Sequence, residues 1–326
     1  MPPSPTAPPP GDVVQTYRYL RGAMVALLLA LLLAVVLQWW LGTDRSCWLG
    51  SVSAYYFTPA RTVFVGALVG LGVVLVAYQG HSPEENVLLD FAGFMALLVA
   101  AVPTVPDLRC GPSPLHESTA QLAAGIAVSV PTLVSLALLV LLALALIRLR
   151  SASVGTRSRP TRSTVVVSVV CALVIAVELV LVAVLRDRSV AVAHGIAATT
   201  MVLGAVAVMV SSALRVEERH GASTAQQQTA AGYRRTYLAI AVVLAALLAS
   251  IVLAHLLITG FDLTVLLAEV AVLVLFGAYW VVQTVELWGL GDAAHPEARD
   301  LRTPLRRGLP ATSSRSPTRD PGRGAP

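Results

Sequence analysis

Four ionisable side chains lie inside long apolar runs of this sequence: Glu178, His194, His255 and Glu269. At about 1.5 Å per helical residue, each lies roughly 6–12 Å from the outer end of its run, so all four share one depth in a membrane. A charge in hydrocarbon costs several kcal/mol, so such groups face a bundle interior, pair with one another or line a wet cavity. The pattern predicts a polar pocket near the outer face of a membrane.

Two carboxylates and two imidazoles at one depth fit either a proton relay or a metal site. The alternative is a His–Glu hydrogen bond that only stabilises packing. None of the six histidines has a second histidine three or four residues away, which is the spacing typical of a helical zinc site. We therefore expect no metal and no other cofactor.

A second group of polar and aromatic side chains is concentrated in the string SVSAYYFTPARTVFVGALVGLG. In one interpretation, a ligand enters from outside between Ser51, Ser53, Tyr55, Tyr56 and Arg61. In the other, the aromatic residues form an interfacial belt, and Gly66 and Gly70 form a small-residue face for close helix packing. The spacing alone does not choose between them.

Two of the three cysteines fall in the longest connections that we assign to the outer side, where a disulfide persists. One hypothesis is a bridge between Cys47 and Cys110, and the alternative is two unpaired thiols. Cys171 lies inside an apolar run and is expected to pack as a small buried residue.

The composition places these side chains in a membrane protein. The chain of 326 residues is 56% hydrophobic and 13% charged, with a mean hydropathy of +0.76, whereas about a quarter of the residues in a soluble domain are charged. We predict an all-α polytopic bundle of about eight spanning helices, because backbone groups in lipid must be satisfied internally. The expected spans are 23–41, 62–78, 87–102, 121–147, 164–185, 190–213, 237–258 and 263–287. The fourth contains Pro131 and is expected to kink there.

Arginine supplies all 23 basic residues, and its distribution predicts the orientation. Alternate connections and tails hold 18 of them, and the others hold only Arg45, Arg61, Arg109, Arg186 and Arg188. Positive residues favour the cytoplasmic side, so both termini are expected there, in a multi-pass protein of the cell membrane. The arginines lie beside the ends of the spans, which favours anionic lipid headgroups as partners and not nucleic acid.

The expected division of the chain is a disordered Pro-rich cytoplasmic tail over 1–22, a transmembrane domain over 23–290, and a disordered Arg- and Pro-rich cytoplasmic tail over 291–326. Near the inner membrane face, Gln283 and Glu286 are expected to reach the headgroups by snorkelling. Glu84 and Glu85 are expected to form an exposed turn, with Ser82 as the cap of the following helix.

Motifs of several enzyme classes are missing from the sequence, because it contains no P-loop, no GxGxxG after a strand and no GxSxG. The leading hypothesis is a non-enzymatic carrier of small solutes or lipids, or a sensor, that uses the outer polar pocket. One alternative is a membrane-embedded lipid hydrolase or transferase with the same polar layer. Another is a structural subunit of a membrane complex, and the sequence does not set the oligomeric state.

Three strings carry a resemblance to known proteins: SVSAYYFTPARTVFVGAL, ENVLLDFAGFMALLVAAVPT and AEVAVLVLFGAYWVVQTVELW. They resemble an uncharacterised family of bacterial multi-pass membrane proteins, remotely similar to eukaryotic six-helix membrane proteins of the Frag, DRAM and Sfk type. The resemblance implies that the Ser/Tyr string, His194 and Glu269 belong to a shared framework, and it carries no reaction. The middle of this chain departs from a six-helix pattern by two further expected spans.

Overall fold

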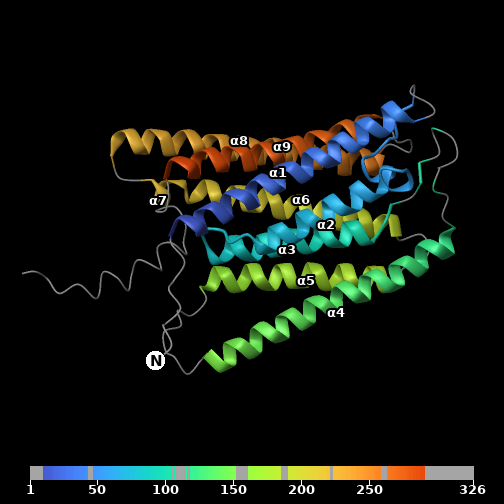
Figure 1. Ribbon diagram of the computed structural model, residues 1–326, viewed down its shortest axis with the longest axis horizontal. Helices are drawn as coiled ribbons and strands as arrows, with labels where there is room; N and C mark the ends of the chain where they lie inside the picture. Colours follow the sequence, from blue (N-terminus) through green and yellow to red (C-terminus); the bar gives the residue numbers. More distant parts are fainter. Residues whose placement is uncertain are drawn as a thin grey trace, which may run out of the picture.

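The regular structure of the chain is entirely helical in the residues that the computed structural model describes (Figure 1). Those residues are 10–42, 47–104, 106–107, 110, 115, 118–151, 161–184, 190–220, 223–257 and 263–290. The predicted tail over 291–326 lies outside these ranges, as do residues 1–9 of the predicted tail over 1–22. The helices, in chain order, are α1 (Pro10–Leu41), η1 (Ser53–Phe57), α2 (Arg61–Ala77), α3 (Pro83–Ala101), α4 (Thr119–Ser151), α5 (Arg162–Val184), α6 (Val190–Leu214), α7 (Val216–Arg219), α8 (Thr224–Leu257) and α9 (Leu263–Leu290).

Within these ranges, six helices are long and apolar enough to cross a membrane: α1, α4, α5, α6, α8 and α9. The chain is therefore a multi-pass membrane protein in contact with the lipid bilayer. Two of the eight expected spans, α2 and α3, are not among these six helices. Helix α2 has 17 residues, at the short end for a bilayer. Helix α3 carries Glu84, Glu85 and Asp90, which lower its hydropathy.

Six helices pack side by side in a closed order, α1–α2–α3–α6–α8–α9 and back to α1, which we call the six-helix ring. One end of the ring carries η1, and the opposite end carries the short helix α7 (Figure 1). We call them the η1 end and the α7 end. Each end has its own apolar core, with Tyr55, Phe57 and Met95 at the η1 end and Met24, Tyr237 and Trp280 at the α7 end.

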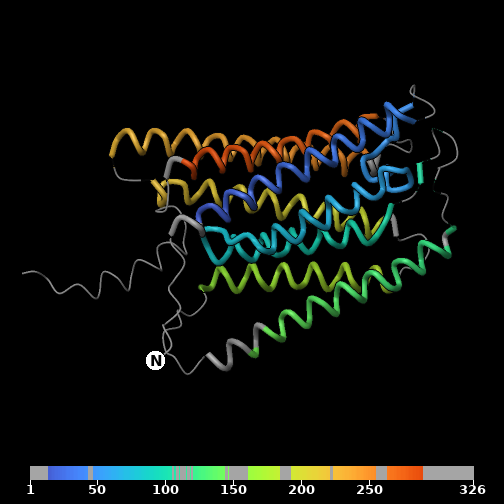
Figure 2. The backbone as a smooth tube through the Cα atoms, viewed as in Figure 1, coloured from blue at the N-terminus to red at the C-terminus, as the bar shows by residue number. Residues whose placement is uncertain are grey.

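Helices α4 and α5 lie outside the ring, where α5 packs on α3 and α6 and α4 packs on α3. Figure 2 shows α4 running obliquely to the other helices. Most apolar side chains of this pair face outward, as Leu141 (62% exposed) and Val170 (53% exposed) illustrate. A soluble protein would not leave so many apolar side chains exposed, and in a bilayer these faces contact lipid tails.

The closest contact between helices joins α2 and α3 through two glycines. A Cβ added at Gly93 would lie 2.7 Å from the carbonyl oxygen of Gly72, and one added at Gly72 would lie 2.7 Å from that of Gly93. Small residues permit this backbone approach. The sequence placed the packing face at Gly66 and Gly70, but Gly66 meets open space, and only Gly70 touches another helix, at Leu27 of α1.

Helix α1 begins well before the expected boundary at residue 23. The tertiary structure explains the extension, because Tyr17 packs edge-on against Tyr78, with ring centroids 5.4 Å apart. The side chain of Arg21 is fully buried and donates a hydrogen bond to the same Tyr78 hydroxyl over 3.3 Å. Residues 10–22 therefore belong to the helical bundle and not to a tail.

The first turns of α3 and α5 are joined through Glu84. Its Oε1 accepts hydrogen bonds from the hydroxyls of Thr161 (2.8 Å), Ser163 (2.7 Å) and Thr164 (2.7 Å). The hydroxyls of Thr164 and Ser163 are the main reason that the pKa of Glu84 is lowered to about 2. Ser82 caps α3 by accepting a hydrogen bond from the amide of Glu85, as the sequence predicts. The peripheral helix α5 is thus anchored to the ring by a carboxylate that stays ionised.

We predict that Gly93→Ala destabilises the protein by roughly 1–3 kcal/mol, because the added methyl group would overlap a backbone oxygen that cannot move alone. Unfolding of the purified protein in an SDS titration measures the change. Gly66→Ala is the matched control and should be neutral or stabilising by up to about 1 kcal/mol, since helix propensity favours alanine and the space is open. Equal stability of the two variants would contradict the close contact.

Candidate functional site

At the η1 end, Glu269 of α9 holds the chain just before η1. Its carboxylate accepts hydrogen bonds from the Ser51 hydroxyl (2.9 and 3.1 Å to the two oxygens) and from the amide of Val52 (2.6 Å). A carboxylate that accepts from a backbone amide forms a strong, charge-assisted hydrogen bond. Glu269 therefore fixes the position of the segment that leads into η1.

His194 of α6 holds the next residue of the same segment. Its Nδ1 lies 2.6 Å from the carbonyl oxygen of Val102, and its Nε2 lies 2.9 Å from the hydroxyl of Ser53. A carbonyl only accepts, so Nδ1 carries the hydrogen, and Nε2 accepts from the Ser53 hydroxyl. The buried imidazole therefore links η1 with the end of α3.

The structure thus brings together two of the four predicted pocket residues and two of the predicted entrance residues. Glu269 and His194 come from different helices and bind Ser51 and Ser53, two positions apart. Glu178 is 1% exposed on α5, and neither of its carboxylate oxygens has a hydrogen-bond partner among the described residues. His255 belongs to α8, and its side chain lies outside the described part of the structure.

Three covalent or polar links join the α1–η1 connection to the α3–α4 connection. Cys47 and Cys110 form a disulfide, with Cα atoms 5.6 Å apart. The amide of Gly50 donates to Asp107 (2.7 Å), and the amide of Leu115 donates to the Phe57 carbonyl (3.3 Å). Together they form a cap over the η1 end of the bundle.

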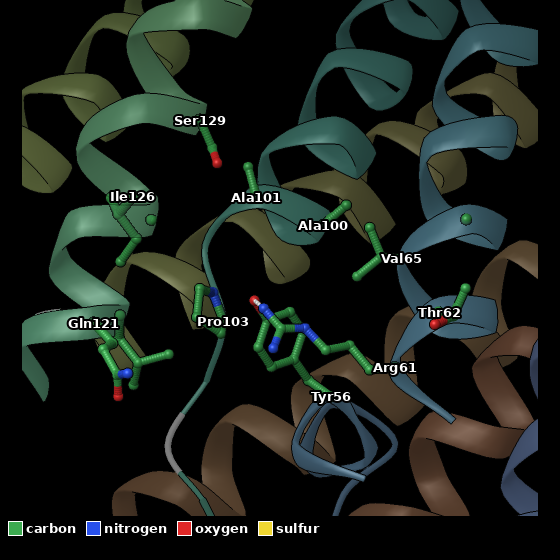
Figure 3. Close-up of a pocket in the computed structure, with 13 residues that line it drawn as sticks. Tyr56, Arg61, Thr62, Val65, Ala100, Ala101, Pro103, Gln121, Ile126 and Ser129 are labelled. Atoms are coloured by element: carbon green, nitrogen blue, oxygen red, sulfur yellow. Dashed lines mark hydrogen bonds between the residues drawn. The ribbon is translucent and has the colours of Figure 1, made fainter. Parts of the chain in front are cut away.

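Tyr55, Tyr56 and Arg61 differ in their surroundings. Tyr55 is buried under the cap, and burial is the main reason that its pKa is raised to about 12, so it remains a neutral phenol. The guanidinium of Arg61 lies 4.2 Å above the centre of the Tyr56 ring and donates to the Tyr56 hydroxyl. Figure 3 shows this stacked pair at the wall of a cavity.

The cavity has a volume of about 590 Å³ and lies between α2, the end of α3 and the first half of α4. Its polar lining includes Arg61, Tyr56 and Gln121, and its apolar lining includes Val65 and Ile126 (Figure 3). Glycines contribute two further positions, Gly66 and Gly125, and a Cβ added at either would meet nothing within 4 Å. One charged end and an apolar body are the features expected of a site for an amphiphile.

A second polar cluster lies at the α7 end and was missed by sequence reasoning. Glu85, Gln283 and Glu286 were expected at the membrane surface, yet all three are buried. Arg219 forms an ion pair with Glu286 (Nε to Oε1, 3.2 Å) inside the bundle. Distance from a helix end indicates depth in the membrane, but it does not show that neighbouring helices cover the side chain. In the sequence, the clearest hint of this cluster is Arg21, a charged residue directly before the first predicted span. The structure shows that it is fully buried, and a buried arginine requires polar partners.

Among the residues that the structure describes, no three His, Cys, Asp or Glu side chains converge as metal ligands. No protein-family model, curated protein or solved structure matches the chain. Inferences about its function therefore rest on its own geometry.

We predict that Glu269→Gln and His194→Ala each speed amide hydrogen exchange in residues 51–57, roughly tenfold or more at Val52 for Glu269→Gln, because a charge-assisted hydrogen bond is lost. Hydrogen–deuterium exchange with mass spectrometry measures this. Glu217→Gln, which removes an exposed ion pair with Arg234, is the control and should leave η1 unchanged. Unaltered exchange in both site variants would mean that neither side chain holds η1.

We predict that Cys47→Ser lowers the free energy of unfolding by about 2–4 kcal/mol, because the disulfide closes a chain separation of 63 residues. Reducing agent should destabilise the wild type by the same amount and leave Cys47→Ser unaffected. Peptide mapping under non-reducing conditions checks the pairing. Alkylation of both cysteines in the untreated protein would contradict it.

Proposed function

We propose that the protein binds an amphiphile in the cavity at the η1 end and acts as a carrier or sensor of that ligand in the cell membrane. The observation that carries the proposal is the cavity itself. Its volume of about 590 Å³ falls within the roughly 300–1,000 Å³ of small-molecule sites. Its lining combines a guanidinium with apolar side chains from two helices that face lipid.

The class of ligand follows from the order of groups along the wall. Arg61 is the first residue of α2, beside the cap, and Val65 lies one turn deeper. Arginine forms paired hydrogen bonds with carboxylate or phosphate. An anionic headgroup would therefore bind beside Arg61, with its acyl chain along Val65 and Ile126. Arg61 also stacks on Tyr56, which keeps the guanidinium at the wall.

The location of the cavity supports lateral entry from the bilayer. One wall belongs to the ring, through α2 and α3, and the other belongs to α4, which lies outside the ring. A ligand can pass between α4 and the ring while every ring contact stays intact.

The proposal includes the orientation and the number of spans. We place both termini in the cytoplasm and the η1 end outside. We count α2 and α3 as spans in addition to the six long apolar helices, which makes eight. The arginine distribution supports this orientation, and a disulfide at the η1 end agrees with an oxidising compartment. If the resemblance to six-helix membrane proteins holds, the six ring helices would form the shared framework, and α4 and α5 would be the two additional spans.

We predict that Gly125→Leu lowers retention of an anionic phospholipid by the purified protein at least about tenfold, because the side chain fills the cavity, while stability is unchanged or slightly raised. Native mass spectrometry after exposure to mixed phosphatidylglycerol and phosphatidylcholine micelles measures retention. Gly232→Leu is the matched control, because a Cβ there also meets open space and Gly232 lies on α8, away from the cavity.

Arg61→Gln tests the headgroup contact separately. It should abolish the preference for phosphatidylglycerol over phosphatidylcholine, whereas Arg234→Gln, on an exposed surface of α8, should retain it. Equal retention by wild type and Gly125→Leu would show that the cavity is not the binding site.

A further inference from the structure

The polar cluster at the α7 end joins side chains from all six ring helices or the connections beside them. Its members are Arg21 (α1), Tyr78 and His81 (the α2–α3 turn), Glu85 (α3), Ser212 (α6), Arg219 and His220 (α7 and the residue after it), Tyr237 (α8), and Tyr279, Gln283 and Glu286 (α9). We call this set the α7-end network. The cavity at the η1 end uses none of these residues.

The two carboxyl groups of the network have different surroundings. Glu286 forms an ion pair with Arg219 and also accepts from the Tyr237 hydroxyl, so its negative charge is matched by a cation and a donor. Glu85 is equally buried, but no arginine of the described residues lies within salt-bridge distance of it. Its hydrogen-bond donors are neutral, namely the Ser212 hydroxyl (2.9 Å) and the amide of His81 (2.9 Å).

Opposing effects act on the charge of Glu85. Burial without a contacting cation favours the neutral acid. The positive charges of Arg219 and Arg215 favour the carboxylate. Arg219 donates to the carbonyl of Ser212 over 3.0 Å, and the hydroxyl of the same Ser212 donates to Glu85. Carboxyl groups of one cluster whose surroundings differ in this way take on different protonation states. Glu286 is the ionised member, and Glu85 is the member that can gain or lose a proton.

The hydroxyls around Glu85 can accommodate both of its states. When Glu85 is ionised, the Ser212 hydroxyl donates to Oε1. When Glu85 is neutral, its own proton is donated to the Ser212 oxygen, and the Ser212 hydroxyl turns toward Tyr279, 3.0 Å away, where either atom can be the donor. The oxygens of Ser212 and Tyr279 keep their places in both states, and only their hydroxyl hydrogens turn.

His81 provides a path from the solution to Glu85. Its Nδ1 lies 3.4 Å from Arg219 Nη1, and it accepts a hydrogen bond from that guanidinium in the tautomer that has its hydrogen on Nε2. The same nitrogen lies 3.9 Å from Glu85 Oε2. The His81 side chain is 9% exposed at the end of the bundle, whereas that of Glu85 is fully buried. In the tautomer with its hydrogen on Nδ1, the imidazole can accept a proton from the α7 side at Nε2 while the Nδ1 hydrogen passes to Glu85, once the 3.9 Å separation closes to hydrogen-bond distance; a neutral imidazole with its hydrogen on Nε2 is left.

From these contacts we propose that the α7-end network is a proton-binding site, in which Glu85 holds one exchangeable proton and His81 connects it with the solution at the α7 end. The bond formed is O–H on Glu85, and the proton comes from water through His81. This site is separate from the amphiphile cavity, and the proposal does not depend on whether the cavity binds a ligand.

Infrared difference spectroscopy of the purified protein tests the proposal, because a protonated carboxyl group has a C=O stretch that an ionised one lacks. We expect the part of this band that belongs to Glu85 to lose intensity in one titration as the pH rises from about 5 to about 9. Glu85→Gln should remove that titrating component. Glu84→Gln, at the neighbouring position, should keep it, as should Glu286→Gln, and Glu178 and Asp90 are present in all of these samples.

A second variant covers the case in which Glu85→Gln fails to fold. Ser212→Ala removes a donor to the ionised carboxylate, so the titration should move to higher pH by about one unit or more. A titrating band in Glu85→Gln equal to that of the wild type would overturn the proposal. So would loss of the band in Glu286→Gln with retention in Glu85→Gln, or an unmoved midpoint in Ser212→Ala.

Discussion

The contact of Gly72 with Gly93 determines how the remaining helices can be arranged. It brings the axes of α2 and α3 close enough for backbone atoms to touch. Helix α3 then has room on its other sides for α6 within the ring and for α4 and α5 outside it. Because α3 is covered by neighbours on nearly every side, it can carry Glu85 in its first turn without exposing that carboxyl group to lipid. A longer side chain at either glycine would separate the two helices and open the centre of the bundle.

Polar side chains are concentrated at the two ends of the ring, and they serve different purposes there. At the η1 end, Glu269 and His194 bind backbone and hydroxyl groups of one short segment, so they position the segment and are themselves satisfied. At the α7 end, buried carboxyl, guanidinium, phenol and hydroxyl groups bind one another across helices. The apolar cores between these ends contain the large aromatic and aliphatic side chains that hold the ring together.

The sequence predicted the helices better than it predicted the partners of their polar residues. Hydropathy located apolar runs for every long helix, and depth counting placed His194 and Glu269 in one layer, where they do hold adjacent parts of η1. The same counting treated Glu286 as a surface group, because a residue about one turn from a helix end can reach headgroups unless other helices surround it. Arg219 and Tyr237 surround it here, and both come from distant parts of the chain. Single-sequence patterns contain local periodicity but not the order of helices around a ring. The cavity was unpredictable for the same reason, since α2 and α4 line it only once α4 is placed outside.

The first and last helices of the ring, α1 and α9, are neighbours. During synthesis α1 is made before the other ring helices, and its partner on that side is made after all of them. Tyr78 links the two, since it receives a hydrogen bond from Arg21 and donates one to Gln283. Until α9 arrives, the guanidinium of Arg21 must remain at the membrane surface or pair with Tyr78 alone. The ring therefore closes late, through contacts between residues that are far apart in the sequence. A chain truncated before residue 263 would insert its earlier helices yet leave the ring open.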